Sequence, residues 1–345
     1  MQYEKTLSHA FEGGAAINVS MLKYRMTIEG GSGLMKQALL LLNMGGANNL
    51  DEVELFLNNM FADKRILPVN SYLRRFIASI IIRKRLDDVK ENYKLLGGKS
   101  PLSEQTGKLI EKLKRKLEIP IYPAMRYVPP FASEALEKCR EEGIEELLLF
   151  PMYPQYSTTT TLSSVEDIEA GCELMGYTPK ITVLEPYYDD YEYIAATAQK
   201  IIEAMKGRDT AEYDLILSAH GLPMSIIRAG DPYEKQIEAN VSALKIYLKE
   251  RGVEFRRITL AYQSKVGSSA WLEPNLADIL RKPEHLKVLV YPLAFTIDNS
   301  ETVYELDIEH REIAEKIGYE SYIVAECLND DDAFVEFITG RVDGR

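Results

Sequence analysis

The sequence predicts an α/β protein whose parallel sheets are covered by helices on both faces. Short, continuously apolar runs alternate with longer amphipathic stretches along the chain from Gln37 onward. Continuous apolar strands that alternate with helices are typical of parallel sheets buried on both sides. The composition, 46% hydrophobic and 27% charged, is that of a globular protein with well-buried cores.

Eight apolar runs are expected to form strands. In chain order they are Ala38–Leu42, Ile119–Tyr122, Glu146–Phe150, Ile181–Leu184, Asp214–Leu217, Ile258–Ala261, Lys287–Pro292 and Ser321–Ala325. Between them, apolar residues spaced three and four apart predict helices, for example over Tyr191–Met205 and Tyr233–Arg251. The strand spacing and a change of pattern near residues 170–180 predict two α/β domains of similar size.

The predicted organisation divides the chain into four parts. Residues 1–34 end in Gly30-Gly31-Ser32-Gly33, which is typical of a linker, so we interpret Met35 as the native start and residues 1–34 as a non-native extension. Residues 35–175 are expected to form an N-terminal α/β domain and residues 176–325 a C-terminal one. Residues 326–345 are expected to be a C-terminal segment that packs back on the first domain.

Composition and charge exclude several classes of protein. Lys and Arg number 41 against 53 Asp and Glu, and the net charge of −12 argues against a surface devoted to nucleic acid. The cysteines Cys139, Cys172 and Cys327 lie far apart, which indicates reduced thiols rather than disulfides or structural zinc. No apolar stretch approaches the ~20 residues of a membrane span, and no signal peptide is visible. We therefore expect a cytoplasmic protein.

One histidine stands at the end of a predicted strand. His220 follows the apolar run Leu215–Leu217 closely, and Gly221 and Pro223 end that strand. The carboxyl end of a strand is where open α/β sheets place ligand chemistry. A lone histidine of this kind is more often a hydrogen-bonded structural residue, so its partner decides the interpretation.

A run of carboxylates follows another predicted strand. Glu301, Glu305 and Glu309 are spaced four residues apart after the apolar run Val288–Phe295, which places them on one helix face. They form either a solvated acidic face or a series that attracts metal or relays protons. Because His220 and Glu301 both lie at strand ends, they can converge and offer an imidazole and a carboxylate to Fe²⁺ and to protons.

Six motifs, in this order along the chain, resemble the ferrochelatase family. They are LNMGG (42–46), MRYVPP (125–130), MYPQYSTTT (152–160), SAHGLP (218–223), AYQSKVG with WLEP (261–267, 271–274) and ETVYELDIE (301–309), and the resemblance spans residues 36 to about 330. It implies two Rossmann-like domains of the chelatase type with a porphyrin cleft between them. It also implies a lyase that inserts Fe²⁺ into protoporphyrin IX to make protoheme, the terminal step of heme biosynthesis.

The resemblance implies roles for individual residues. His220 and Glu301 match the family's catalytic pair, and Glu305 and Glu309 join them as metal or proton carriers. The residues implied to contact the porphyrin are Arg85, Tyr93 and Ser100 at its propionates, Met44, Arg126 and Tyr127 on the face opposite His220, and Tyr262 and Trp271 against the flat macrocycle. An ordinary core aromatic is an equally good interpretation of Trp271.

Two departures from the family pattern change what is expected. Many relatives carry His two positions before the essential Glu, whereas this chain has Asn299, which cannot titrate near neutral pH. Some relatives hold a two-iron cluster through four cysteines near the C-terminus, where this chain has only Cys327. We therefore expect no iron–sulfur cluster and no tightly bound cofactor, with Fe²⁺ as a substrate.

The segment 64–85 is strongly basic in an acidic protein. Its cations are Lys64, Arg65, Arg74, Arg75, Arg83, Lys84 and Arg85, with no acid among them and with Phe76, Ile77 and Ile80–Ile82 interleaved. One interpretation is a lip that contacts an anionic membrane surface peripherally and admits a hydrophobic porphyrin. The other is a helix with a core Ile face whose basic side chains bind propionates or solvent.

Three alternative functions stay open at this point. The chain could be a coproporphyrin ferrochelatase or another tetrapyrrole chelatase, such as one for cobalt, or a non-catalytic tetrapyrrole carrier. A hydrolase with Ser218 or Ser264 as nucleophile is disfavoured because no GxSxG elbow is present. The expected partners are porphyrin and ferrous iron, and the sequence does not predict an oligomeric state.

Overall fold

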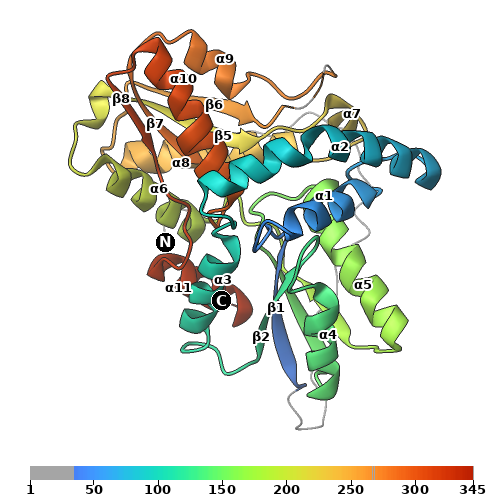
Figure 1. The fold of residues 1–345 in the computed structure, drawn as a ribbon. Helices are drawn as coiled ribbons and strands as arrows, with labels where there is room; N and C mark the ends of the chain where they lie inside the picture. Colours follow the sequence, from blue (N-terminus) through green and yellow to red (C-terminus); the bar gives the residue numbers. More distant parts are fainter. Residues whose placement is uncertain (1–34, 266, 268, 345) are drawn as a thin grey trace, which may run out of the picture. The chain divides into compact units, whose positions relative to one another are not determined.

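Two parallel sheets form the framework of the protein. The computed structural model describes residues 35–344 except 266 and 268, and the predicted extension 1–34 lies outside the described residues. Each sheet has four strands and is flanked by helices (Figure 1). The predicted α/β fold with two Rossmann-like units is therefore confirmed.

The first sheet has the strand order β2-β1-β3-β4. Its strands are β1 Gln37–Asn43, β2 Ile121–Met125, β3 Glu146–Pro151 and β4 Lys180–Val183. The helices of this half are α1 Glu52–Ala62, α2 Ser71–Leu95, α3 Leu102–Leu113, α4 Ala132–Glu141, the short π-helix η1 Thr158–Leu162 and α5 Ser163–Met175. The central strands β1 and β3 are buried almost throughout, as expected where helices cover both faces.

The second sheet has the strand order β6-β5-β7-β8. Its strands are β5 Asp214–His220, β6 Arg257–Gln263, β7 Lys287–Pro292 and β8 Ser321–Val324. The helices of this half are α6 Tyr191–Met205, the 3₁₀-helix η2 Thr210–Glu212, α7 Met224–Arg228, α8 Tyr233–Glu250, α9 Leu276–Arg281, the π-helix η3 Glu301–Glu309, α10 His310–Ile317 and α11 Asp332–Val342. His220 is the last residue of the central strand β5 and pairs with Gln263 of β6.

Two predicted boundaries differ from the structure. The strand predicted over Ile119–Tyr122 runs instead over Ile121–Met125, through Pro123. Proline is tolerated there because β2 is an edge strand, where one row of backbone groups needs no sheet partner. The predicted domain boundary at residue 175 precedes β4, which pairs with β3, so the first sheet extends to Val183.

The C-terminal helix α11 contacts helices of both halves. Lys112 of α3 donates to the carboxylate of Asp332 at 2.8 Å, and α11 also packs against α6. Phe337 lies in the core with its ring edge-on to Phe150 of β3, 6.5 Å between centroids. The last described residues thus pack against elements that precede them by about two hundred positions.

Candidate active site

The ends of two strands bring one histidine and one glutamate together. His220 ends β5, and Glu301 begins η3 in the connection that follows β7. Nδ1 of His220 lies 3.0 Å from Oε2 of Glu301. The two side chains are 33% and 41% exposed, so the pair is within reach of a ligand from solvent.

The electrostatics of the pair favour a proton on His220. Burial lowers the pKa of the His220 imidazole, but the charge and hydrogen bond of Glu301, with a further contribution from Glu305, raise it above its usual value. Burial raises the pKa of the Glu301 carboxyl, whereas the charge and hydrogen bond of His220 bring it below its usual range. Each partner therefore stabilises the charged form of the other.

The turn after His220 is held from two sides. Gly221 N donates to Gln263 O at 2.9 Å, and the Tyr233 hydroxyl donates to His220 O at 2.9 Å. A Cβ at position 221 would lie 2.8 Å from Gln263 O and 3.3 Å from the Trp271 ring. Because the nearest obstacle is backbone, only glycine fits at this position.

Gly221→Ala is therefore expected to lower the free energy of unfolding by about 1–3 kcal/mol, the usual cost of an overpacked site. The matched control is Gly107→Ala in α3, where a Cβ meets nothing within 4 Å. That change is expected to stabilise the protein by about 0.5–1 kcal/mol, because alanine is the better helix residue. Urea unfolding of both variants checks this, and equal effects would contradict the packing at Gly221.

Glu305 is engaged in holding the end of β6. Its carboxylate accepts from Ser264 N at 2.7 Å, from the Ser264 hydroxyl and from Gln263 Nε2 at 3.1 Å. Ser264 has φ of +66°, an uncommon conformation for a residue with a side chain. Burial and the charge of Glu301 raise the pKa of the Glu305 carboxyl. The hydrogen bonds from Ser264 and the charge of His220 act to lower it, but the net change is upward.

The predicted metal residues do not form one ligand set. In the described part of the chain, no group of three or more His, Cys, Asp or Glu side chains is arranged to hold a metal ion. Glu301 faces His220, Glu305 faces Ser264 and Glu309 is exposed. The segment is also a π-helix rather than the expected α-helix, with hydrogen bonds between residues five apart.

Tyr93, near the end of the long helix α2, lies close to the His220–Glu301 pair. Its buried hydroxyl accepts from Ala47 N at 3.2 Å. Burial raises the pKa of the Tyr93 phenol, hydrogen bonding to Ser300 and Ala47 opposes this, and the charge of Glu301 adds to it. Tyr93 therefore lies beside Ser300, the residue that precedes Glu301.

The glycine pair of the LNMGG motif packs against the loop that follows α2. A Cβ at Gly46 would lie 2.6 Å from the Ser100 hydroxyl, and one at Gly45 would lie 2.6 Å from Val128. The backbone of the same loop pairs with the MRYVPP motif, since Tyr127 N donates to Met44 O at 3.0 Å. Motifs about eighty residues apart thus form one close-packed region.

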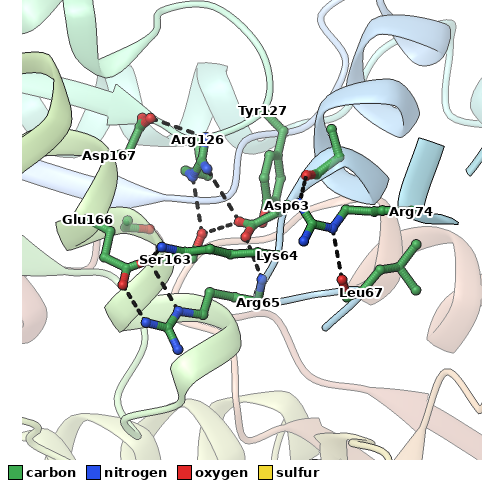
Figure 2. A network of polar contacts seen from close by, with 12 residues as sticks. Asp63, Lys64, Arg65, Leu67, Arg74, Arg126, Tyr127, Ser163, Glu166 and Asp167 are labelled. Carbon is green, nitrogen blue, oxygen red and sulfur yellow. Dashed lines mark hydrogen bonds and ion pairs between the residues drawn. The ribbon is translucent and has the colours of Figure 1, made fainter. Parts of the chain in front are cut away.

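Arg126 and Tyr127 belong to a polar network around a buried carboxylate, Asp63 (Figure 2). Arg126 lies 3.4 Å from Asp63 and 3.2 Å from Asp167, and its Nε donates to the Ser163 hydroxyl at 3.1 Å. The Tyr127 hydroxyl donates to Asp63 at 2.9 Å, and Ser163 donates to the same carboxylate. The sequence reasoning missed Asp63, Ser163 and Asp167, because only the fold brings these separate segments together.

Asp231 links the two halves near His220, and it was also missed. Its Oδ2 accepts from the backbone and hydroxyl of Thr158, both at 2.7 Å, and from Ser157 at 3.0 Å. Its Oδ1 accepts from the backbone N of Tyr233 at 3.0 Å. Since Tyr233 also donates to His220 O, Asp231 ties the MYPQYSTTT motif to the turn after His220. The one available sign in the sequence was an Asp-Pro pair just before a predicted helix.

The eight residues predicted to contact porphyrin differ in accessibility. Arg85 is exposed and Met44, Arg126 and Trp271 are partly exposed, whereas Tyr93, Ser100, Tyr127 and Tyr262 are buried. Contact with a porphyrin would require those four buried side chains to become exposed. Two polar hollows of about 440 and 410 Å³ in the described residues are lined by none of the eight and not by His220 or Glu301.

The three cysteines are free and buried. Cys327 follows β8, and its backbone N donates to Asp298 at 3.3 Å. Burial, followed by the charge of Asp298, raises the pKa of the Cys327 thiol well above its usual value. The expected absence of an iron–sulfur cluster stays a prediction.

Comparison with known proteins places these features in a family. A family model described as Ferrochelatase matches residues 36–345. Curated proteins named Ferrochelatase include those of Wolinella succinogenes, 49% identical over 88% of this chain and 97% of the relative, and Sulfurimonas denitrificans, 47% identical over the same shares. A Helicobacter pylori (strain G27) relative is 43% identical over 89% of this chain and 93% of its own.

Solved structures support the fold alone. SirB from Bacillus subtilis with Fe³⁺ matches with a TM-score of 0.54 at 12% identity, over 90% of this chain and 95% of that chain. The sirohydrochlorin chelatase SirB from Bacillus subtilis subspecies spizizenii in complex with cobalt matches with a TM-score of 0.55 at 12% identity, over 90% and 94%. The six motifs, the two sheets and the sequence relatives agree, and the chain belongs to the ferrochelatase family, the lyases that insert ferrous iron into a porphyrin.

Proposed function

We propose that His220 and Glu301 of this chain remove the pyrrole protons of protoporphyrin IX while Fe²⁺ enters the macrocycle, giving protoheme. The observation that carries the proposal is the 3.0 Å contact between the side chain of His220, which ends β5, and that of Glu301, which begins η3. Family membership supports the reaction class. The relatives' printed names say only Ferrochelatase, so the choice of protoporphyrin belongs to the proposal.

The 3.0 Å contact supports separate tasks for the two nitrogens of His220. Nδ1 faces Glu301, so its N–H donates to the carboxylate and the lone pair of Nε2 is left to accept a proton. When Nε2 takes a pyrrole proton, the imidazolium that forms is stabilised by the negative charge of Glu301. The side chain is partly exposed, so it can pass this proton to solvent and accept the second one. Two N–H bonds are broken and iron–nitrogen bonds replace them.

The substrate must also be held in a shape that exposes its nitrogen lone pairs. A planar macrocycle hides them, and contacts remote from the reacting atoms supply the strain that bends it. Trp271 packs beside the Gly221 turn and is partly exposed, so it is placed to offer a flat surface near His220. Arg85 is exposed on α2 and can present a bidentate fork to a propionate.

An anaerobic assay tests the substrate and the reaction together. Fe²⁺ is supplied with protoporphyrin or with coproporphyrin, and the loss of porphyrin fluorescence is followed for each. We expect conversion of protoporphyrin to be the more efficient. Faster conversion of coproporphyrin would support the coproporphyrin alternative, a preference for Co²⁺ would support another chelatase, and binding without conversion would support a carrier.

We also propose that α2 contacts an anionic membrane surface peripherally. Tyr72 and Phe76 are 86% and 62% exposed, which is unusual for aromatic side chains, and Ile80 is exposed near them. The exposed cations Arg75, Arg83, Lys84 and Arg85 share this helix. Apolar side chains beside cations suit an interface with anionic lipid.

The other cations of the basic segment, Lys64, Arg65 and Arg74, make contacts within the protein. Lys64 and Arg65 pair with Glu166 of α5, and Arg74 donates to the carbonyl groups of Leu67 and Val69. Among the described residues, no helix is long and apolar enough to cross a membrane. The lipid contact therefore concerns α2 rather than the whole of residues 64–85, and the cytoplasmic location stays a prediction.

Phe76→Ser is expected to reduce co-sedimentation with vesicles that contain anionic lipid several-fold, because it removes an exposed aromatic anchor. The matched control is Leu174→Ser in α5, which is 89% exposed but far from the basic segment in sequence, and it should leave binding unchanged. Wild-type binding that is absent, or that does not depend on anionic lipid, would contradict the membrane contact.

A further inference from the structure

We propose that Asn299 is a positioning residue that sets the place of Glu301 against His220. The proposal rests on the proposed function of that pair, and it concerns how the pair is held. Asn299 lies two residues before Glu301, in the connection between β7 and η3, and is only 9% exposed.

Both ends of the Asn299 amide are bound. Its Oδ1 accepts from Glu301 N at 2.8 Å and from Thr302 N at 3.3 Å. Its Nδ2 donates to Ile297 O at 3.1 Å. Because the oxygen faces two donors and the nitrogen faces an acceptor, only one orientation of the amide satisfies all three contacts.

The contacts are reciprocal across the first turn of η3. Asn299 N donates to the Thr302 hydroxyl at 3.0 Å, and Val303 N donates to Asn299 O at 3.0 Å. This arrangement resembles a capping box, in which a side chain at each end of the first turn satisfies the other's backbone N–H. The start of the helix is therefore fixed by side chains and not only by its own backbone ladder.

The same turn is anchored to the segment after β8. The Thr302 hydroxyl donates to Asp298 Oδ1 at 2.8 Å. Oδ2 of Asp298 accepts from Asn329 Nδ2 at 2.6 Å, and Asp298 N donates to Asn329 Oδ1 at 2.9 Å. Asp298, Thr302 and Asn329 are all buried, so a network of buried hydrogen bonds supports the turn.

Glu301 depends on this support. Its backbone N is held directly by Asn299, while its partly exposed side chain reaches His220. A shift of the first turn would therefore lengthen the 3.0 Å contact with His220. An amide carries no proton near neutral pH, so Asn299 acts through the position of Glu301 and not as a proton carrier.

The test compares three variants in the anaerobic assay. Asn299→Ala is expected to lower kcat about tenfold or more while KM for protoporphyrin changes less than about twofold, because misplacement affects the reacting geometry more than binding. Asn299→Ser keeps an oxygen acceptor for Glu301 N and should recover most of kcat. The matched control is Asp190→Ala, which removes the same kind of cap from α6, where Glu192 N donates to Asp190 Oδ1 at 3.0 Å. It should leave kcat unchanged.

Rates are normalised to the folded fraction from urea unfolding, so a loss of stability is not counted as a loss of function. Unchanged kcat in Asn299→Ala, an equal fall in Asp190→Ala, or no recovery with serine would overturn the positioning role. A failure of the proposed function looks different, since wild type would then not convert protoporphyrin or would not depend on His220.

Discussion

His220→Ala is expected to lower kcat for iron insertion by about 10²- to 10⁴-fold, the range usual for loss of a general base. The variant should still bind protoporphyrin with near-normal affinity, because the imidazole accepts protons and the proposed binding contacts lie on other residues. Anaerobic kinetics gives kcat, and fluorescence quenching in the absence of iron gives the affinity.

The matched control for this variant is His285→Ala. His285 is the partly exposed histidine between α9 and β7, and it lines a polar hollow that contains none of the predicted site residues. Its removal should leave kcat unchanged. Turnover near the wild-type rate in His220→Ala, or an equal loss in both variants, would contradict the role given to His220.

Glu301→Gln is expected to lower kcat by about 10- to 100-fold. A hydrogen bond to a charged group is worth about 1.5–3 kcal/mol, and solvent screens part of this because the Glu301 side chain is 41% exposed. The amide keeps the shape of the side chain and removes its charge. The imidazolium formed when His220 takes a pyrrole proton then has no negative partner.

The pH profile of the same variant has a defined direction of change. Proton acceptance needs neutral His220, so kcat/KM should fall as pH drops through the pKa of this group. In wild type Glu301 holds that pKa above its usual value, while burial acts to lower it. With the charge removed, the burial effect dominates and the acid limb should move to lower pH. An acid limb that stays in place or moves to higher pH would contradict the coupling of the two residues.

Much of the fold could be predicted because apolar runs determine strands in a parallel sheet. The run at 287–292 matches β7, and the other predicted strands overlap their observed counterparts. The boundary errors occur where tertiary position decides the outcome. Pro123 is acceptable only because β2 is at a sheet edge, and β4 belongs to the first sheet only because it pairs with β3.

The pair at the centre of the site was also predictable, for a topological reason. His220 ends β5, and Glu301 lies in the connection that follows β7. Because β5 and β7 are adjacent and parallel, their carboxyl ends meet at one edge of the sheet. The π-helical form of η3 was not predictable, because a spacing of four between acidic residues does not distinguish it from an α-helix. The hydrogen bond from Ser264 N to the Glu305 carboxylate was not predictable either, because Ser264 adopts a left-handed backbone conformation that the sequence does not indicate.

The exposure of the predicted porphyrin-contact residues could not be predicted from the sequence. The family resemblance assigns Tyr93, Tyr127 and Tyr262 to the porphyrin site but carries no information on their exposure, and the structure buries all three. The carboxylate that binds Arg126 and Tyr127 comes from Asp63, more than sixty residues earlier in the chain. Such contacts arise from packing between distant segments, so no pattern in the neighbouring sequence indicates them.

Chemical rescue of His220→Ala by imidazole tests the central claim most directly. Protoporphyrin is bound to the variant first, Fe²⁺ is added anaerobically, and the rate of a single turnover is followed as imidazole is increased at constant ionic strength. Wild type in the same series corrects for binding of imidazole to iron. If His220 accepts the pyrrole protons, the rate of the variant should rise with the concentration of neutral imidazole while that of wild type does not. A rate that imidazole does not change would contradict this role for His220.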